Sequence, residues 1–156
     1  MKHILIVCTG NICRSPMAAG LMRHALAERG VDGIEVISTG ISALAGVPAD
    51  PMVQEVLKPF GVDVSDHRGR MITEELIEWA DRILVMTAEH RVFVEAMVPE
   101  ASEKIRLLGA YGPGNDPERG IPDPYGGSAF QYRACVVELH EAIDGFLVLE
   151  GEALDG

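Results

Sequence analysis

The sequence predicts an α/β protein, a single domain built on an open four-stranded parallel sheet with helices on both faces. Short apolar runs typical of buried strands alternate with segments whose apolar side chains recur every three or four residues, as on one face of a helix. The chain has 156 residues, enough for one domain with a workable core, and it contains no repeat, linker or low-complexity segment.

Each element is predicted from a local pattern. Apolar runs predict strands at 3–7, 34–38, 82–86 and 104–108. Helical spacing predicts a helix after Pro16 and further helices at 50–60, 73–80, 88–97 and about 128–149. The stretch 109–128 is rich in Gly, Pro and Asp and predicts a loop long enough to be functional. We expect residues 1–150 to form the domain and 151–156 to be a C-terminal tail.

The most informative stretch, Cys8-Thr-Gly-Asn-Ile-Cys-Arg14-Ser15-Pro16, lies between the first predicted strand and the helix that follows it. Proline suits the first turn of a helix. The N–H groups of the five residues between Cys8 and Arg14 can point inward, and a concave row of amides at a helix N-terminus binds an oxyanion without a metal. Ligands of open parallel sheets bind at the carboxyl ends of strands, which is where this loop is expected.

The residue types in this loop suit phosphoryl transfer. Arg14 can bind two phosphate oxygens in a bidentate pair. The same arginine and the helix dipole favour the thiolate form of Cys8, which is a nucleophile for covalent catalysis. Ser15 can donate its hydroxyl to Cys8, Asn11 accepts a left-handed backbone conformation, and Gly10 lets the chain pass close to the anion. The plain alternative is a buried cysteine that ends a core strand.

The run Cys8 to Pro16 resembles the low-molecular-weight protein tyrosine phosphatases, and the likeness covers nearly the whole chain. Other stretches fall in the family's order: Ser38-Thr39-Gly40, His67 before Met71-Ile72-Thr73, Ile83-Leu84-Val85-Met86, and Asp123-Pro124-Tyr125-Gly126. The resemblance implies a Rossmann-like fold of the phosphotyrosine phosphatase I type and a cysteine-dependent phosphatase that needs no cofactor. It also implies a phosphocysteine intermediate on Cys8 and a phosphate-binding loop made of Thr9, Gly10, Asn11, Ile12, Cys13, Arg14 and Ser15.

The resemblance nominates Asp123 as the general acid that protonates the leaving group and then as the base that activates water. The simpler interpretation of Asp-Pro-Tyr-Gly is a reverse turn, with Asp123 first, Pro124 second and Gly126 fourth. Both interpretations are compatible, because a rigid turn fixes where the carboxyl group points and a bound phosphate favours its protonated form. Asp116, which also precedes a proline, is the rival candidate.

Further positions are carried over from the family. Ser38 and His67 match residues that hydrogen-bond the asparagine of the phosphate loop, although a strand-ending serine is usually a turn former and a histidine in Asp-His-Arg-Gly-Arg is usually solvated. Ile12, Leu44 and Tyr125 are expected at the substrate mouth. Many relatives have an aromatic residue at the position of Leu44 and a second tyrosine at that of Gly126, so a more open slot is expected here.

The substrate expected from the resemblance is phosphotyrosine. A related bacterial branch that removes phosphate from arginine shares Met-Thr at 86–87 and Asp-Pro-aromatic-Gly-Gly-Ser at 123–128. That branch typically carries threonine where this chain has Ile12, and isoleucine offers an apolar wall to an aryl ring instead. Protein-arginine phosphatase is therefore the alternative. An arsenate reductase would need further redox cysteines downstream, and a non-catalytic phosphate-binding module would lack the nucleophile or the acid.

Composition limits the partners. The formal net charge of −11 disfavours nucleic acid and anionic membrane surfaces. No apolar run is long enough to span a bilayer, and the N-terminus lacks a secretory pattern, so a cytoplasmic protein is expected. We expect a phosphorylated protein or peptide as substrate, inorganic phosphate as product, and a monomer or weak dimer.

The three cysteines, Cys8, Cys13 and Cys135, do not form a disulfide framework. The resemblance suggests that Cys13 pairs with oxidised Cys8 and shields it from irreversible oxidation. The alternative is that Cys13 only packs under the loop. Cys135 is expected to be a core thiol of the last helix. No His or Cys cluster has metal-ligand spacing, and no metal site is expected.

Overall fold

The computed structural model describes residues 1–155, and it contains the predicted sheet of four parallel strands. The strands are β1 (His3–Cys8), β2 (Glu35–Gly40), β3 (Arg82–Val85) and β4 (Ile105–Leu107), in the spatial order β2-β1-β3-β4. Strand β1 lies in the middle and pairs with β2 from His3 to Cys8 and with β3 from Ile4 to Val7. The open parallel fold class is confirmed.

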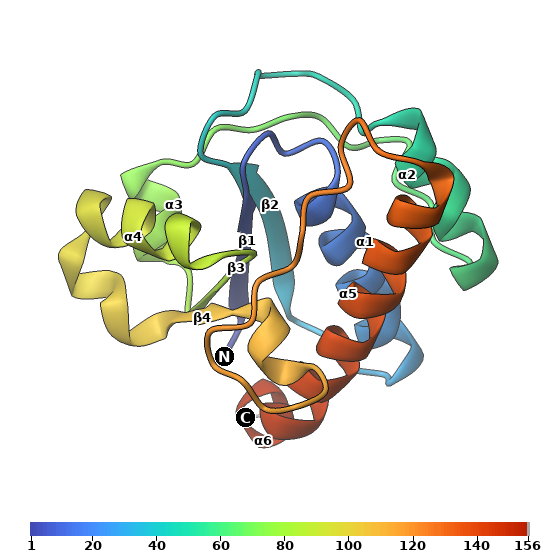
Figure 1. Cartoon of the computed structure of the whole chain (residues 1–156). Helices are drawn as coiled ribbons and strands as arrows, with labels where there is room; N and C mark the ends of the chain where they lie inside the picture. The colour runs from blue at the N-terminus through green and yellow to red at the C-terminus, as the bar shows by residue number, and fades with distance from the viewer. Residues whose placement is uncertain (156) are drawn as a thin grey trace.

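Helices cover both faces of the sheet (Figure 1). One face carries α1 (Arg14–Glu28), α2 (Pro51–Leu57) and α5 (Ala129–Leu149), and the other carries α3 (Glu74–Trp79) and α4 (Ala88–Met97). Short 3-10 turns follow several elements: η1 (Lys58–Phe60), η2 (Pro99–Lys104) and η3 (Leu108–Tyr111). The predicted helix 50–60 therefore divides into α2 and η1, and the C-terminal part of the predicted strand 104–108 turns into η3.

The two faces of β1 explain its continuous apolar sequence. Ile4, Ile6 and Cys8 belong to the core beneath α1, α2 and α5, whereas Leu5 and Val7 belong to the core beneath α3 and α4. A strand buried on both faces needs apolar side chains at every position instead of at alternate ones. Burial of both faces holds β1, and hence Cys8 at its carboxyl end, in a rigid position.

Side-chain caps fix where several helices begin. Asp50 caps α2 by accepting the Met52 N–H, and Thr73 caps α3 by accepting the Leu76 N–H. Thr87 and Ser128 begin α4 and α5 with capping boxes, in which the N-cap and the third helical residue bond each other reciprocally. The starts of these helices are thus determined by local sequence.

The strand order reverses next to β1, because β2 lies on one side of it and β3 on the other. The crevice at the carboxyl ends of strands at such a reversal is where open α/β sheets bind ligands. The loop after β1 and the loop after β3 both open into this crevice.

Residues 151–156, expected as a tail, include a further helix, α6 (Gly151–Asp155). Leu154 of this helix is buried in the main core, and the N-terminal ammonium of Met1 donates to the Ala153 carbonyl at 2.8 Å. The two ends of the described chain therefore lie close together (Figure 1).

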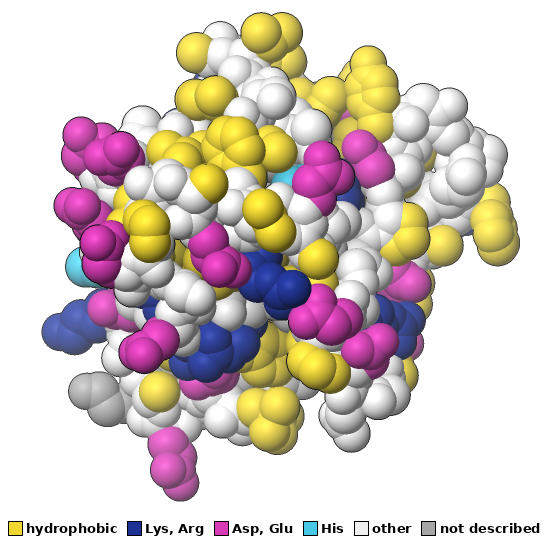
Figure 2. Space-filling model, turned by 60° about the vertical axis from the view of Figure 1, so that its left-hand side comes forward, with side chains coloured by type: hydrophobic (Ala, Val, Ile, Leu, Met, Phe, Trp, Pro, Cys, Tyr) yellow, Lys and Arg dark blue, Asp and Glu magenta, His cyan; other side chains and the backbone are white. Residues whose placement is uncertain are grey.

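On the face shown in Figure 2, Asp and Glu side chains surround separate groups of Lys and Arg, so positive charge forms no continuous surface there. Within residues 1–155, none of the helices is long and apolar enough to span a membrane.

Candidate active site

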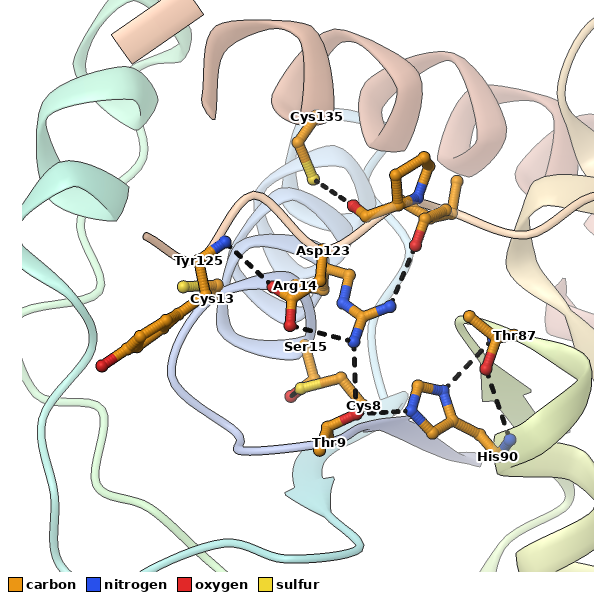
Figure 3. Close-up of polar contacts among 12 residues, drawn as sticks. Cys8, Thr9, Cys13, Arg14, Ser15, Thr87, His90, Asp123, Tyr125 and Cys135 are labelled. Atoms are coloured by element: carbon orange, nitrogen blue, oxygen red, sulfur yellow. Dashed lines mark hydrogen bonds and ion pairs between the residues drawn. The ribbon is translucent and has the colours of Figure 1, made fainter. Parts of the chain in front are cut away.

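The sulfur of Cys8 lies at the bottom of a pocket of about 220 Å³. Cys8 itself is only 2% exposed, as expected for a residue that ends a central strand. The loop after β1, the first turn of α1 and the loop before α5 form the walls (Figure 3). The lining residues are Cys8, Thr9, Gly10, Ile12, Cys13, Arg14, Asp123 and Tyr125.

Two groups approach the Cys8 sulfur. The Asn11 N–H donates to Sγ at 3.2 Å, and the Ser15 hydroxyl oxygen lies 3.0 Å from it. Ser15 Oγ also accepts from Asn11 Nδ2 at 2.7 Å and lies 3.1 Å from the Thr39 carbonyl oxygen. The serine proton therefore has two alternative acceptors, and it can stabilise negative charge on the sulfur when it turns away from Thr39.

Asn11 holds the loop in shape. It is fully buried, and its backbone has the left-handed conformation predicted for it, with φ of 59°. Its side-chain amide donates to Ser38 Oγ and its Oδ1 accepts the Arg70 N–H at 2.8 Å. His67 Nε2 donates to the Asn11 carbonyl at 2.7 Å. The hydrogen bonds expected for Ser38 and His67 are thus present, and burial lowers the pKa of His67, which favours the neutral ring.

The Arg14 guanidinium is buried beside the pocket. Nη1 donates to the Ile121 carbonyl at 2.9 Å, and Nη2 donates to the Thr9 hydroxyl at 3.3 Å. Nη2 also lies 3.5 Å from Asp123 Oδ2. The fixed positive charge lies at the pocket wall, where it favours a negatively charged group in the pocket.

Backbone amides of the loop add to this positive potential. Within residues 1–155, the N–H groups of Gly10, Ile12 and Cys13 donate to no protein acceptor. The first N–H groups of α1 also lack intrahelical partners, as at every helix N-terminus. Unpaired N–H groups beside a buried guanidinium suit the oxygens of a tetrahedral anion. In the same part of the chain no cluster of His, Cys, Asp or Glu is arranged to hold a metal ion.

Asp123 lies beside Arg14 in the wall of the pocket (Figure 3). Its Oδ1 accepts the Tyr125 N–H at 3.1 Å, and its Oδ2 faces Arg14 Nη2 at the edge of the pocket. The rival Asp116 is exposed, caps its own turn by accepting the Glu118 N–H, and lies outside the pocket lining.

The turn in this segment differs in register from the predicted one. The hydrogen bond runs from Gly127 N to Pro124 O, so the turn comprises Pro124 to Gly127 and Gly126 is its third residue, with φ of 78°. A left-handed third residue is typical of a type II turn, which favours glycine there. The prediction of a turn beginning at Asp123 is wrong by one residue, and Asp123 itself accepts the Tyr125 N–H through its side chain.

The mouth of the pocket also differs from expectation. Ile12 and Tyr125 line it as predicted, and Tyr125 is 59% exposed. Leu44 is 72% exposed and is not among the lining residues. Its loop follows β2. The middle of this loop exchanges backbone hydrogen bonds with Gly69, while Ser42 and Asp50 at its two ends donate to the Thr9 and Ile12 carbonyls of the loop after β1.

The other two cysteines are buried thiols. Burial raises the pKa of Cys13 to about 12, and its Sγ lies 3.8 Å from the Tyr132 hydroxyl, which donates to Asp50 at 3.0 Å. Cys135 of α5 is buried as predicted, its pKa is also raised to about 12, and it contacts the Pro122 carbonyl. All three cysteines of the chain are free.

Sequence reasoning missed two features of the site. Gly40 packs so closely on the loop that an added Cβ would lie 2.5 Å from the Thr9 carbonyl oxygen. His90 contacts the Thr9 hydroxyl from the start of α4. The spacing Thr87-x-x-His90 resembles a capping box, which could have revealed the position of this ring relative to its helix but not its contact with Thr9.

Comparison with known proteins agrees with this geometry. The family model described as low molecular weight phosphotyrosine protein phosphatase matches residues 3–155. A probable low molecular weight protein-tyrosine-phosphatase, EpsP of Ralstonia solanacearum, is 37% identical over 147 residues, which cover 94% of each chain. A protein-arginine-phosphatase of Geobacillus stearothermophilus is 40% identical over 142 residues, which cover 91% of each.

Among solved structures, a mutant of the arginine phosphatase YwlE with a phosphorylated active-site serine superposes with a TM-score of 0.88 at 31% identity, covering 96% of both chains. In that relative an active-site side chain that replaces cysteine carries the phosphoryl group.

Proposed function

Because this chain belongs to the low molecular weight phosphotyrosine protein phosphatase family, we propose that it hydrolyses phosphotyrosine in proteins through a phosphocysteine intermediate on Cys8. The observation that carries the proposal is the position of the Cys8 sulfur, at the bottom of a pocket whose walls carry the Arg14 guanidinium and the Asp123 carboxyl group. Phosphorylated protein or peptide enters, inorganic phosphate leaves, and the cytoplasm, where thiols stay reduced, is the compartment we propose.

In the first step the Cys8 thiolate attacks phosphorus, the P–O bond to tyrosine breaks, and Asp123 gives its proton to the departing oxygen. Arg14 and the unpaired loop amides bind the three equatorial oxygens as charge builds on them. Asn11 N–H and the Ser15 hydroxyl, both within hydrogen-bonding distance of the sulfur, favour the thiolate before the attack.

In the second step the Asp123 carboxylate takes a proton from water, and the resulting hydroxide attacks phosphorus. The P–S bond breaks and Cys8 leaves as a thiolate, which the Ser15 hydroxyl stabilises when it turns from the Thr39 carbonyl to the sulfur. Inorganic phosphate then dissociates, and the acid is again protonated for the next substrate.

The lining of the pocket supports an aryl substrate. Ile12 and Tyr125 offer apolar surface on the way to Cys8, and an aromatic ring can pack against both. Phosphoarginine is the second candidate, since the Geobacillus relative is a protein-arginine-phosphatase. There the same steps would break a P–N bond, with Asp123 protonating the guanidinium nitrogen.

The mechanism is tested by mixing the enzyme with an aryl phosphate whose phosphoryl group is radiolabelled, stopping the reaction rapidly with acid, and measuring the label bound to the protein. We expect label on Cys8 in the wild type and greater accumulation of labelled protein in Asp123→Asn. Cys8→Ala should remove both the label and turnover. Cys135→Ser is the matched control, since it alters a buried thiol outside the lining of the pocket, and it should keep both. Full turnover by Cys8→Ala would contradict the proposal.

The substrate class is tested separately, by comparing kcat/KM on two peptides that differ only in carrying phosphotyrosine or phosphoarginine. A higher value for phosphotyrosine is expected. A higher value for phosphoarginine would reassign the substrate and leave the cysteine mechanism intact.

A further inference from the structure

His90 lies within reach of the active-site loop although it is 81 positions away in sequence from its partner, Thr9. The ring is at the start of α4, directly after β3, and is 2% exposed. Thr9 directly follows β1. The two residues thus face each other across the crevice where the strand order reverses (Figure 3).

The hydrogen bonds of His90 define its tautomer. The backbone N–H of Thr87 donates to Nδ1 at 3.2 Å, so Nδ1 carries no proton. Nε2 then carries the ring proton and donates to the Thr9 hydroxyl oxygen at 2.9 Å. Burial, with the charge of Arg14 as a smaller cause, lowers the pKa of His90 to about 4, so this neutral form persists at neutral pH.

The Thr9 hydroxyl links His90 to Arg14. Its hydroxyl oxygen accepts from His90 Nε2 and also from Arg14 Nη2, the nitrogen that faces Asp123. The other terminal nitrogen of the guanidinium is held by the Ile121 carbonyl. A threonine hydroxyl with a single partner can rotate about χ1, whereas a second donor from a rigid helix start fixes the oxygen and hence the orientation of the arginine fork.

We infer that His90 is a positioning residue for phosphoryl transfer, which holds the Arg14 guanidinium in place through the Thr9 hydroxyl. This inference rests on the proposed function, in which Arg14 binds the phosphoryl oxygens. It assigns a role to a residue that touches neither the phosphate nor the thiol.

Two substitutions of His90 separate the hydrogen bond from packing. In His90→Gln, the amide oxygen can accept the Thr87 N–H and the amide nitrogen can donate to Thr9, as the ring does. His90→Leu keeps an apolar body and loses both bonds. Thr73→Ala is the control for stability, because it removes an equivalent N-cap from α3, away from the pocket.

Binding of inorganic phosphate, measured by calorimetry, and kcat/KM on an aryl phosphate are the two readouts. We expect His90→Leu to weaken phosphate binding and to lower kcat/KM, each by about tenfold, the size expected for one hydrogen bond that supports a charged group. His90→Gln should stay within about threefold of wild type and Thr73→Ala within about twofold, even with a lower Tm. Phosphate affinity unchanged in His90→Leu would overturn the inference.

A double-mutant cycle with Thr9→Val tests the route. If His90 acts through the Thr9 hydroxyl, the double variant Thr9→Val/His90→Leu should be no worse than Thr9→Val alone. If the double variant instead loses phosphate affinity by the product of the two single losses, His90 does not act through Thr9. If His90→Leu does not fold, Thr9→Val decides instead, because it removes the oxygen that His90 and Arg14 share and should weaken phosphate binding. Phosphate affinity unchanged in Thr9→Val would refute the inference.

The experiments distinguish failure of the proposed function from failure of the inference about His90. A wild-type protein that forms no phosphocysteine would refute the proposed chemistry, while the phosphate-binding comparison would still report whether His90 supports Arg14.

Discussion

The guanidinium of Arg14 lies 3.5 Å from the carboxylate of Asp123, measured from Nη2 to Oδ2. The contact joins the first turn of α1 to the loop before α5 and closes one wall of the pocket (Figure 3). Arg14 is buried and Asp123 is half exposed, so the pair contributes little to stability in water. Its importance is geometric, because it places a carboxyl oxygen beside the group that binds the phosphoryl oxygens.

Removal of the Asp123 carboxyl group should lower turnover most for substrates whose leaving group needs a proton. We expect Asp123→Asn to reduce kcat by roughly 100-fold on phenyl phosphate, whose leaving group needs a proton. The loss should be much smaller on p-nitrophenyl phosphate. Asp116→Asn is the matched control because Asp116 lies outside the pocket lining, and it should act like wild type. The opposite ranking of the two variants would assign the acid to Asp116.

Substrate choice should respond to position 12. Threonine and valine have the same shape, so Ile12→Thr and Ile12→Val differ only in a hydroxyl group. If Ile12 favours aryl substrates, the ratio of kcat/KM for phosphoarginine over phosphotyrosine peptides should rise by roughly tenfold in Ile12→Thr relative to Ile12→Val. Equal ratios in the two variants would mean that this side chain does not select the substrate.

Gly40 should tolerate no side chain. An added Cβ would lie 2.5 Å from the Thr9 carbonyl oxygen and 2.9 Å from the Asn11 nitrogen, so the phosphate loop must move away. We expect Gly40→Ala to lower the free energy of unfolding by about 1–3 kcal/mol in urea titration and to weaken phosphate binding. Gly151→Ala, where the added Cβ meets nothing within 4 Å, should change neither quantity.

Acid should destabilise the protein partly through His90, whose pKa is lowered from 6.5 to about 4, mainly by burial. Between these values the unfolded chain binds a proton that the folded protein does not, so stability falls as pH falls from about 6.5 to about 4. Through His90, the free energy of unfolding falls by about 3 kcal/mol between pH 7 and pH 4. It falls little further below pH 4, because the folded protein then binds the proton as well.

His90→Gln cannot bind that proton. Urea titrations at pH 7 and pH 4 should therefore show a loss of stability that is smaller in His90→Gln than in wild type by about 3 kcal/mol. The same loss in both proteins would show that His90 titrates normally in the folded state.

Peroxide should link Cys8 to Cys13. Peroxide oxidises the Cys8 thiolate to a sulfenic acid, and attack by the Cys13 sulfur forms the disulfide and releases water. Burial raises the pKa of Cys13 to about 12, so its attacking thiolate is scarce at neutral pH and the rate of bridge formation should increase with pH. Mass spectrometry measures the bridge, with Cys135→Ser as control. Sulfinic acid on Cys8 without any bridge would show that Cys13 only packs under the loop.

Features that depend on neighbouring residues could be predicted from the sequence. The apolar run before Cys8, the helical spacing after Pro16 and the left-handed Asn11 are decided within a few residues, and the structure agrees with each. The turn after Asp123 begins one residue later than the sequence predicts, because Gly126 takes the left-handed third position of the turn, which favours glycine, instead of the fourth position. The placement of Leu44 at the substrate mouth follows from relatives that have an aromatic residue at this position. In this chain the smaller leucine side chain is not part of the pocket lining.

The sequence by itself determined the strand, loop and helix that present Cys8 and Arg14, since periodicity, a proline and a helix start are local properties of the chain. Only the tertiary structure decided which distant side chains meet them. Thr9 meets His90 because β1 and β3 are neighbours in the sheet, and Arg14 meets Asp123 because α5 packs on α1. Such contacts depend on strand order and helix packing, which the whole core determines and no short stretch of sequence specifies.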